Sequence, residues 1–144
     1  MKKEIKLIAL DLDGTTFNSE KVITERTREA IAEAIKKGVI VMPATGRQKT
    51  GLPESFTSIP GVRYALTSNG GAVVDLWEDS MIYADFIPYK TACRVIDQLI
   101  QIDALIEFYH DGKSYADRKS YNRAFHDYKN FPDWFKEYIK VSRS

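Results

Sequence analysis

The chain has 144 residues and a mass of 16.5 kDa, with 21 basic and 20 acidic side chains, 44% hydrophobic residues and 12% aromatic residues. This composition is typical of a globular protein and excludes a disordered chain, a collagen and a coiled coil. The net charge of +1 gives no electrostatic footprint for nucleic acid, and no basic run marks a membrane-binding surface.

The cysteine content and the first apolar stretch indicate where the protein works. A single cysteine, Cys93, excludes an internal disulfide framework and suits a reducing compartment. The apolar stretch from Leu7 to Leu10 is interrupted by Asp11, so it is too short for a signal-peptide core or for a membrane span of about 20 residues. We therefore expect a cytoplasmic protein with no membrane segment.

The first third of the chain predicts a strand, a helix and a second strand. The apolar run Ile5–Leu10 is typical of a buried strand, and Val39–Met42 is a second such run. Between them, 24–37 predicts a helix with Thr24 as its N-cap and Gly38 as its end. A strand, a helix and a strand in this order form a βαβ unit, so we expect the two strands to be parallel.

Aromatic residues divide the rest of the chain, since only three of them precede residue 76. We therefore expect a first unit over residues 1–87 and a second unit over 88–144. The remaining expected elements are a weak helix over 48–59 disturbed by Gly51 and Pro53, a strand over 63–67, a hairpin of 72–76 with 81–87, an amphipathic helix with apolar positions from 92 to 100, a hairpin of 105–109 with 114–116 turned at Asp111-Gly112, and a helix over 131–139.

The residues that end the first strand carry the most chemical information. Asp11 and Asp13 lie two apart on an extended segment, so their side chains point to the same side of the chain. Ligands of open parallel sheets bind beyond the carboxyl ends of the strands, which is where this pair lies. Two carboxylates about 4 Å apart repel by about 4 kcal/mol at an effective dielectric near 20, unless they share a cation or one is protonated. A hard divalent ion such as Mg²⁺ relieves this repulsion and also binds a phosphate oxygen.

This chemistry indicates phosphoryl transfer, with one carboxylate as nucleophile and the other as proton donor and acceptor. The second strand ends at Thr45, whose hydroxyl suits a phosphate oxygen, and at Gly46, whose backbone N–H is unobstructed. The alternative is that the acid pair is a solvated turn after a strand. Thr45-Gly46 could likewise be an ordinary strand-to-helix turn.

Three segments resemble the motifs of one enzyme family. Asp11-Leu12-Asp13-Gly14-Thr15, after an apolar strand, resembles the first motif of the haloacid dehalogenase-like phosphohydrolases. Ala44-Thr45-Gly46-Arg47 resembles their second motif, and Ser68-Asn69-Gly70-Gly71 resembles the third-strand loop of the Cof-type sugar-phosphatase branch. Order and spacing match over residues 5–87, and a weaker resemblance to the start of that branch's α/β cap begins at residue 88.

The resemblance implies an α/β fold, with a Rossmann-like three-layer core whose first three strands form a parallel sheet, followed by the start of an α/β cap. It implies that Asp11 is the nucleophile that forms an aspartyl-phosphate. Asp13 would be the general acid/base, and both aspartates would hold Mg²⁺, Asp13 through its backbone carbonyl.

The same resemblance assigns the phosphate and substrate contacts. The Leu12 N–H, Thr45 and Gly46 would bind the transferring phosphoryl group, and Arg47 and Asn69 are candidate substrate contacts. The family also has a later lysine and a Gly-Asp-x-x-Asn-Asp-like acidic motif, and neither has a counterpart in this sequence. The chain therefore resembles the N-terminal half of a longer enzyme, and we expect very weak turnover from it alone.

Three functions remain open from the sequence. The first is a Mg²⁺-dependent phosphatase of small phosphorylated metabolites, present as an N-terminal fragment. The second is a non-catalytic phosphate- or metal-binding module, and the third is one chain of a split enzyme. In the family the sheet continues beyond the first strand. We therefore expect an exposed apolar edge there, through which the chain dimerises, aggregates or pairs with a missing C-terminal half.

Overall fold

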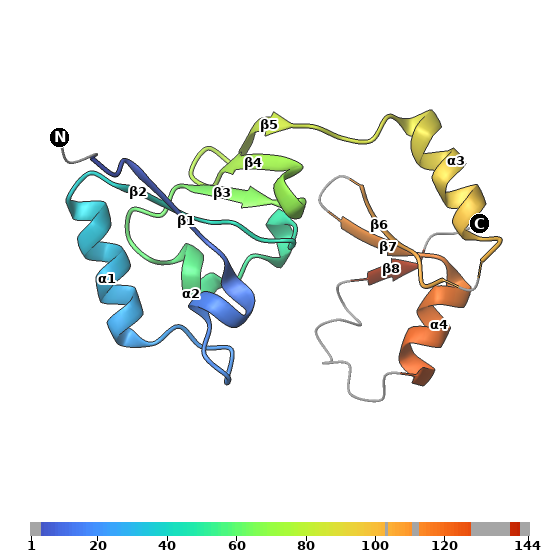
Figure 1. Cartoon of the computed structure of the whole chain (residues 1–144), viewed down its shortest axis with the longest axis horizontal. Coiled ribbons are helices and arrows are strands. Elements are labelled where there is room, and N and C mark those ends of the chain that lie inside the picture. The colour runs from blue at the N-terminus through green and yellow to red at the C-terminus, as the bar shows by residue number, and fades with distance from the viewer. Residues whose placement is uncertain (1–3, 103, 111–112, 128–138, 142–144) are drawn as a thin grey trace. The chain divides into compact units, whose positions relative to one another are not determined.

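A computed structural model describes residues 4–102, 104–110, 113–127 and 139–141 (Figure 1). The chain forms two compact units, Met1–Asp85 and Phe86–Ser144, and each is described by itself. The sequence places this boundary after residue 87. No helix in the described part of the chain combines the length and the apolar character needed to cross a bilayer.

The first unit is built around short strands at whose ends the candidate site lies. Its elements are β1 (Leu7–Leu10), α1 (Glu25–Lys36), β2 (Ile40–Pro43), α2 (Glu54–Thr57), β3 (Tyr64–Thr67), β4 (Ala72–Asp75) and β5 (Ser80–Ala84). β1 and β2 pair in parallel from Leu7 opposite Ile40 to Leu10 opposite Pro43. An isolated parallel bridge between Ala44 and Leu66 joins the end of β2 to β3. The expected α/β fold, with three parallel strands at its start, is confirmed.

The strands β3, β4 and β5 form an antiparallel meander, and its β4–β5 pair is the hairpin expected of 72–76 with 81–87. At the other side of the sheet, β1 pairs only with β2 among the described residues. Apolar side chains are exposed there, with Leu7 at 47% and Ile5 at 65% of their full accessibility. The described sheet thus has the apolar edge that the sequence leads us to expect at its first strand.

Helix α1 forms where the sequence predicts it and covers the core. The Thr24 hydroxyl accepts a hydrogen bond from the Thr27 N–H at 3.3 Å, which caps the helix start. Gly38 follows the helix end with φ +80, a conformation that glycine adopts without strain. The buried core of this unit consists of Leu12, Phe17, Ile23, Ile31, Val41, Phe56, Ile59 and Val62.

The segment over 48–59 is not the single weak helix that the sequence suggests. It forms a 3₁₀ turn at Lys49–Gly51 and the short α2, with Leu52 between them in an extended conformation at ψ 130. Pro53 explains the break, because a proline disfavours the helical conformation of the residue before it and offers no N–H to the preceding turn.

The second unit contains α3 (Tyr89–Leu99), β6 (Glu107–His110), β7 (Lys113–Ala116), α4 (Arg118–Asp127) and β8 (Ile139–Val141). The expected hairpin is present as antiparallel β6 and β7, while its turn at 111–112 lies outside the described residues. Of the helix expected over 131–139, residues 131–138 also lie outside them. Ile139 belongs to β8 instead, where it pairs in parallel with Ser114, so the expectation is wrong at that residue.

Helix α4, which contains His126, begins after an aspartate that caps it. The Asp117 carboxylate accepts the backbone N–H groups of Lys119 at 2.9 Å and Ser120 at 3.1 Å. This is the behaviour of an N-cap aspartate, a residue type that marks helix starts.

Candidate active site

The loop after β1 presents two carboxylates on either side of a buried leucine. The chain stays extended at Asp11 (φ -67, ψ 146) and at Asp13 (φ -79, ψ 115), and Leu12 between them is fully buried in the core. Gly14 then turns the chain with φ +82. A wide turn closes the loop, because the Thr16 N–H donates to the Asp11 carbonyl at 3.2 Å. The buried leucine fixes the loop and leaves both aspartates exposed.

Asp11 is held through one carboxylate oxygen. The Thr15 hydroxyl donates to Asp11 Oδ2 at 2.9 Å, and the Thr16 hydroxyl donates to the Asp11 main-chain oxygen. Thr15 is not among the site residues predicted from the sequence. Its spacing of four residues from Asp11, across a glycine turn, is the signal that could have identified it.

Asp13 forms a bidentate ion pair with Arg47 from the loop after β2. Arg47 Nε donates to Asp13 Oδ2 at 2.9 Å and Arg47 Nη2 donates to Asp13 Oδ1 at 2.8 Å. The hydrogen bonds from Arg47 lower the pKa of Asp13; partial burial opposes this, and the charges of Arg47 and Lys21 reinforce it. Asp13 thus has a counter-ion from the chain itself, whereas the sequence predicts that Mg²⁺ or a proton relieves the repulsion between the two aspartates.

Backbone hydrogen bonds bring the ends of the first three strands together. Leu10 lies opposite Pro43, and the Ala44 N–H donates to the Leu10 carbonyl at 2.8 Å. The Thr45 N–H donates to the Leu66 carbonyl of β3 at 3.0 Å. Asp11 and Thr45 therefore leave the sheet at the same edge, as the βαβ prediction requires.

Thr45 is the centre of the second loop. It is nearly buried, at 8% exposure, and its hydroxyl accepts the Arg47 N–H at 3.2 Å. Its carbonyl accepts the Asn69 N–H at 3.2 Å, which ties the loop after β3 to the loop after β2. Asn69 has φ +54, a left-handed conformation that asparagine tolerates better than most residues.

Gly46 lies against the side chain of Asn69. A β-carbon placed on Gly46 would come within 2.8 Å of Asn69 Oδ1. The structure therefore joins Thr45, Gly46, Arg47 and Asn69 by direct contacts and links them to Asp13 through the arginine. No hydrogen bond joins Asp11 to Thr45 in the described part of the chain; what relates them is that both follow the carboxyl ends of paired strands.

Gln48, which follows the arginine, is a residue that the sequence analysis misses. Its side chain is 2% exposed, and neither its amide oxygen nor its amide nitrogen has a hydrogen-bond partner among the described residues. Buried amides normally find partners, so this one is costly for the fold. No pattern in the sequence marks it, because burial of this loop is decided by tertiary packing.

The two aspartates offer oxygen atoms, the type of ligand that a hard divalent cation prefers. Mg²⁺ in proteins usually keeps several waters and takes one or two carboxylates together with substrate phosphate oxygens. The exposed Asp11 carboxylate and the Asp13 main-chain oxygen supply donors of this type. The described residues contain no cluster of three or more His, Cys, Asp or Glu side chains that could hold a metal by themselves.

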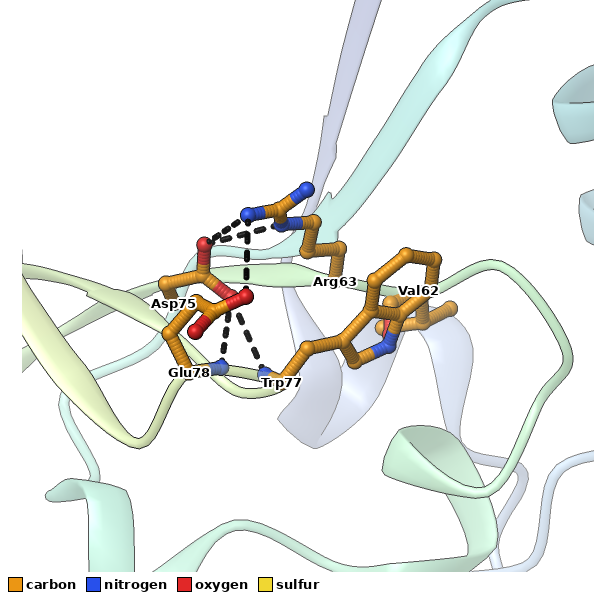
Figure 2. A network of polar contacts seen from close by, with 5 residues as sticks. All are labelled: Val62, Arg63, Asp75, Trp77 and Glu78. Carbon is orange, nitrogen blue, oxygen red and sulfur yellow. Dashed lines mark hydrogen bonds and ion pairs between the residues drawn. The ribbon is translucent and has the colours of Figure 1, made fainter.

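A second polar network lies at the opposite end of β3 from this site (Figure 2). Asp75, at the end of β4, accepts Arg63 Nε at 2.8 Å and the N–H groups of Trp77 at 3.0 Å and Glu78 at 3.2 Å. The hydrogen bond from Arg63 is the main cause of a lowered pKa at Asp75, and the two N–H groups add to it. Trp77 Nε1 donates to the Val62 carbonyl at 3.1 Å. This network fastens the β4–β5 turn and has no part in the candidate site.

Comparison with known proteins agrees with the motifs in these loops. A family model described as haloacid dehalogenase-like hydrolase matches residues 8–143. A 5-amino-6-(5-phospho-D-ribitylamino)uracil phosphatase of Bacillus subtilis (strain 168) is 39% identical over 88 residues, covering 58% of this chain and 35% of that protein. A second phosphatase of that organism with the same named substrate is 31% identical over 109 residues, covering 74% of this chain and 36% of that protein.

Solved structures agree with the fold. A haloacid dehalogenase-like hydrolase from B. subtilis superimposes with a TM-score of 0.75 at 20% identity, covering 97% of this chain and 55% of that chain. The chain thus spans little more than a third of the length of the two phosphatases and about half of this structural neighbour.

Proposed function

Because this chain belongs to the haloacid dehalogenase-like hydrolase family, we propose that it carries the nucleophile, the general acid/base and the phosphate-binding loops of a Mg²⁺-dependent phosphohydrolase. One observation carries the proposal. Asp11 and Asp13 follow the carboxyl end of β1, and Thr45 follows the carboxyl end of the paired parallel strand β2, so all three lie at the same end of the sheet. Two relatives are named for a phosphorylated ribitylamino-uracil. This supports small phosphorylated metabolites as the substrate class.

In the proposed reaction the Asp11 carboxylate attacks phosphorus and forms an aspartyl-phosphate, while the bond from phosphorus to the leaving oxygen breaks. Asp13 gives a proton to that oxygen and later takes one from the water that hydrolyses the aspartyl-phosphate, which restores both carboxyl groups. The N–H groups of Leu12 and Gly46 and the Thr45 hydroxyl hold the phosphoryl oxygens. Mg²⁺, held by the Asp11 carboxylate and the Asp13 main-chain oxygen, would offset the negative charge that builds up between carboxylate and phosphate.

We also propose that the site is completed by polypeptide beyond this sequence. Catalysis of phosphoryl transfer rests on positioning and on charge stabilisation. Among the described residues, Arg47 forms an ion pair with Asp13, and Lys21 acts on Asp13 through its charge. Loss of one stabilising group typically lowers turnover by about 10²- to 10³-fold. The exposed β1 edge supports pairing with a C-terminal half or with a second copy.

Hydrolysis of p-nitrophenyl phosphate with and without Mg²⁺ tests the proposal. We expect slow, Mg²⁺-dependent turnover that Asp11→Asn reduces to the uncatalysed background. Asp79→Asn, at an exposed carboxylate of the β4–β5 turn, is the control and should leave the rate unchanged. Turnover that persists in Asp11→Asn would contradict the assignment of the nucleophile. Activity that appears only when a C-terminal half is added would show a split enzyme.

One observation favours the alternative of a non-catalytic binding module. Both oxygens of Asp13 are engaged by Arg47, and a carboxylate held in this way is poorly placed to donate a proton. Under this alternative the chain binds orthophosphate without hydrolysing any phosphate ester, with or without a second polypeptide. Phosphate titration followed by NMR, combined with the turnover assay, separates the two functions.

A further inference from the structure

A tight turn over residues 18–22, which contains Lys21, follows the loop that carries the two aspartates. The Lys21 N–H donates to the Asn18 carbonyl at 2.9 Å, and the Asn18 N–H donates to the Val22 carbonyl at 3.1 Å. The Asn18 side-chain oxygen also accepts the N–H groups of Glu20 at 3.0 Å and Val22 at 2.9 Å. These hydrogen bonds fix the backbone of the turn, which lies between β1 and α1 in Figure 1.

The turn is anchored in the same core as the loop of the two aspartates. Phe17 before the turn and Ile23 after it are 7% and 4% exposed. Both belong to the buried cluster that includes Leu12, the residue between the two aspartates. The Phe17 N–H also donates to the Leu12 carbonyl at 3.0 Å. Because packed side chains leave little freedom to move, the turn and the aspartate loop are held in a fixed relation.

Lys21 has a backbone conformation that is unusual for its residue type. Its φ is +58, in the left-handed region where non-glycine residues other than asparagine, aspartate and histidine are uncommon. A lysine there costs free energy that a glycine would avoid. Among the described residues, the other non-glycine positions with positive φ are Ser68, Asn69 and Asp79, and the first two lie in the loop after β3 at the candidate site. Strained residues cluster at functional sites, so the strain at Lys21 points to a function of its side chain.

The exposed Lys21 ammonium acts on the candidate site through its charge. Hydrogen bonds from Arg47 are the main cause of the lowered pKa of Asp13, and the charge of Lys21 adds to it. Arg47 donates to both oxygens of the Asp13 carboxylate. Lys21, by contrast, takes part in no ion pair within the described part of the chain. Its charge is therefore available to a negative group that enters beside the two aspartates.

We propose that Lys21 binds the phosphate group of the substrate, as a positive contact supplied to the candidate site by the turn over 18–22. This inference rests on the phosphate site of the proposed function and adds a residue to it. A phosphate that approaches Asp11 and Asp13 meets two negative carboxylates, and a lysine ammonium offsets that repulsion as a compact point charge. Since the turn is already fixed, little backbone has to be ordered when phosphate binds.

Titration of orthophosphate into the whole chain, followed by NMR, tests the contact. In the wild type we expect the Lys21 side-chain signal to shift in proportion to phosphate occupancy. In Lys21→Gln orthophosphate should bind about five-fold more weakly, equivalent to about 1 kcal/mol, which is the upper end for an exposed ion pair. Lys37→Gln, which removes the same charge at the far end of α1, is the matched control. This control and the conservative variant Lys21→Arg should both stay within about two-fold of the wild-type affinity.

Lys21→Gly separates the phosphate contact from the stability of the fold. Glycine adopts the positive φ of residue 21 without strain, so this variant should unfold at no lower urea concentration than the wild type. Its orthophosphate affinity should nevertheless fall as far as that of Lys21→Gln. Wild-type affinity in Lys21→Gly would overturn the proposal in a chain that is fully folded.

The remaining contrary outcomes separate this inference from the proposed function. Unchanged orthophosphate binding by Lys21→Gln, together with weaker binding by Thr45→Ala, overturns the role of Lys21 while the phosphate site itself stands. An equal loss of affinity in Lys37→Gln assigns the effect to net charge and also overturns that role. A Lys21 side-chain signal that does not change at saturating orthophosphate has the same meaning and needs no variant. Absence of orthophosphate binding by the wild type overturns both this inference and the phosphate site of the proposed function.

Discussion

The side-chain oxygen of Asn69 lies directly against Gly46, where a β-carbon would come within 2.8 Å of it. The contact joins the loop after β3 to the loop after β2, beside the Asn69 N–H that donates to the Thr45 carbonyl. The Asn69 side chain thus leaves no room for a β-carbon on residue 46. Asn69 is also a candidate substrate contact.

We therefore predict that Gly46→Ala displaces the Asn69 side chain and weakens orthophosphate binding by about ten-fold or more. The unfolding free energy should change by less than about 1 kcal/mol, because a side-chain end can move aside. In an Asn69→Ala background the same substitution should cost little further binding, since the clash is gone. Additive losses of phosphate affinity in that double-mutant cycle would show that the contact with Asn69 is not what restricts Gly46.

Gln48 gives a prediction about stability. Its carboxamide is buried without a partner among the described residues, and an unsatisfied buried polar group costs about 1 to 3 kcal/mol. Gln48→Met keeps a similar side-chain length and removes the polar atoms, so the unfolding free energy measured in urea should rise by about 1 kcal/mol. Gln98→Met, on the exposed face of α3, is the control and should lie within about 0.5 kcal/mol of the wild type. A clear loss of stability in Gln48→Met would mean that a buried water satisfies the amide.

Asp75 gives a prediction about acid stability. Arg63 and two backbone N–H groups lower its pKa from the ordinary value of 3.8. A carboxyl whose folded-state pKa is lowered stabilises the fold above its unfolded-state pKa, and this contribution is lost as the pH falls through the folded-state pKa. The unfolding free energy should therefore fall between about pH 5 and about pH 3, the range around the unfolded-state pKa.

Asp75→Asn removes this titration and tests its share of the acid sensitivity. We expect the variant to be less stable than the wild type at pH 7, because the amide cannot replace the charge opposite Arg63. We also expect a smaller further loss on acidification. Chemical unfolding at both ends of the range measures the two slopes, and identical slopes would assign the acid sensitivity to other carboxyl groups.

The edge of β1 gives a prediction about association. Leu7 is 47% exposed on a strand that pairs only with β2 among the described residues, and such edges pair readily with other chains. We expect the wild type to elute on size exclusion larger than a monomer of 16.5 kDa. Leu7→Lys should shift it toward the monomer, because an edge lysine opposes strand pairing.

Met81→Lys is the matched control for the β1 edge. Met81 lies on β5 at the other side of the first unit and is 55% exposed. If the β1 edge drives association, this variant should elute like the wild type. A greater effect of Met81→Lys than of Leu7→Lys would show that the chain associates through β5. A wild type that is monomeric at working concentration would contradict the prediction of association.

The local pattern of the sequence was enough to determine much of the first unit. Apolar runs that end in Asp11 and Pro43, separated by a capped helix, require parallel strands whose carboxyl ends meet, because a βαβ connection permits little else. The sequence alone therefore predicted that the acid pair and Thr45 lie together at the carboxyl ends of the strands. Where the pattern was weak, the structure differs from the prediction. The helix expected over 48–59 is split at Pro53 into a 3₁₀ turn and a short helix.

Only the tertiary structure decided how the site residues meet. Arg47 lies 34 positions from Asp13, and its choice of that carboxylate depends on the course of the loop after β2. The burial of Gln48 and the packing of Asn69 on Gly46 depend on the same loop. Periodicity and capping report contacts between residues near in sequence, whereas ion pairs and buried amides between distant loops are set by how the strand ends converge in three dimensions.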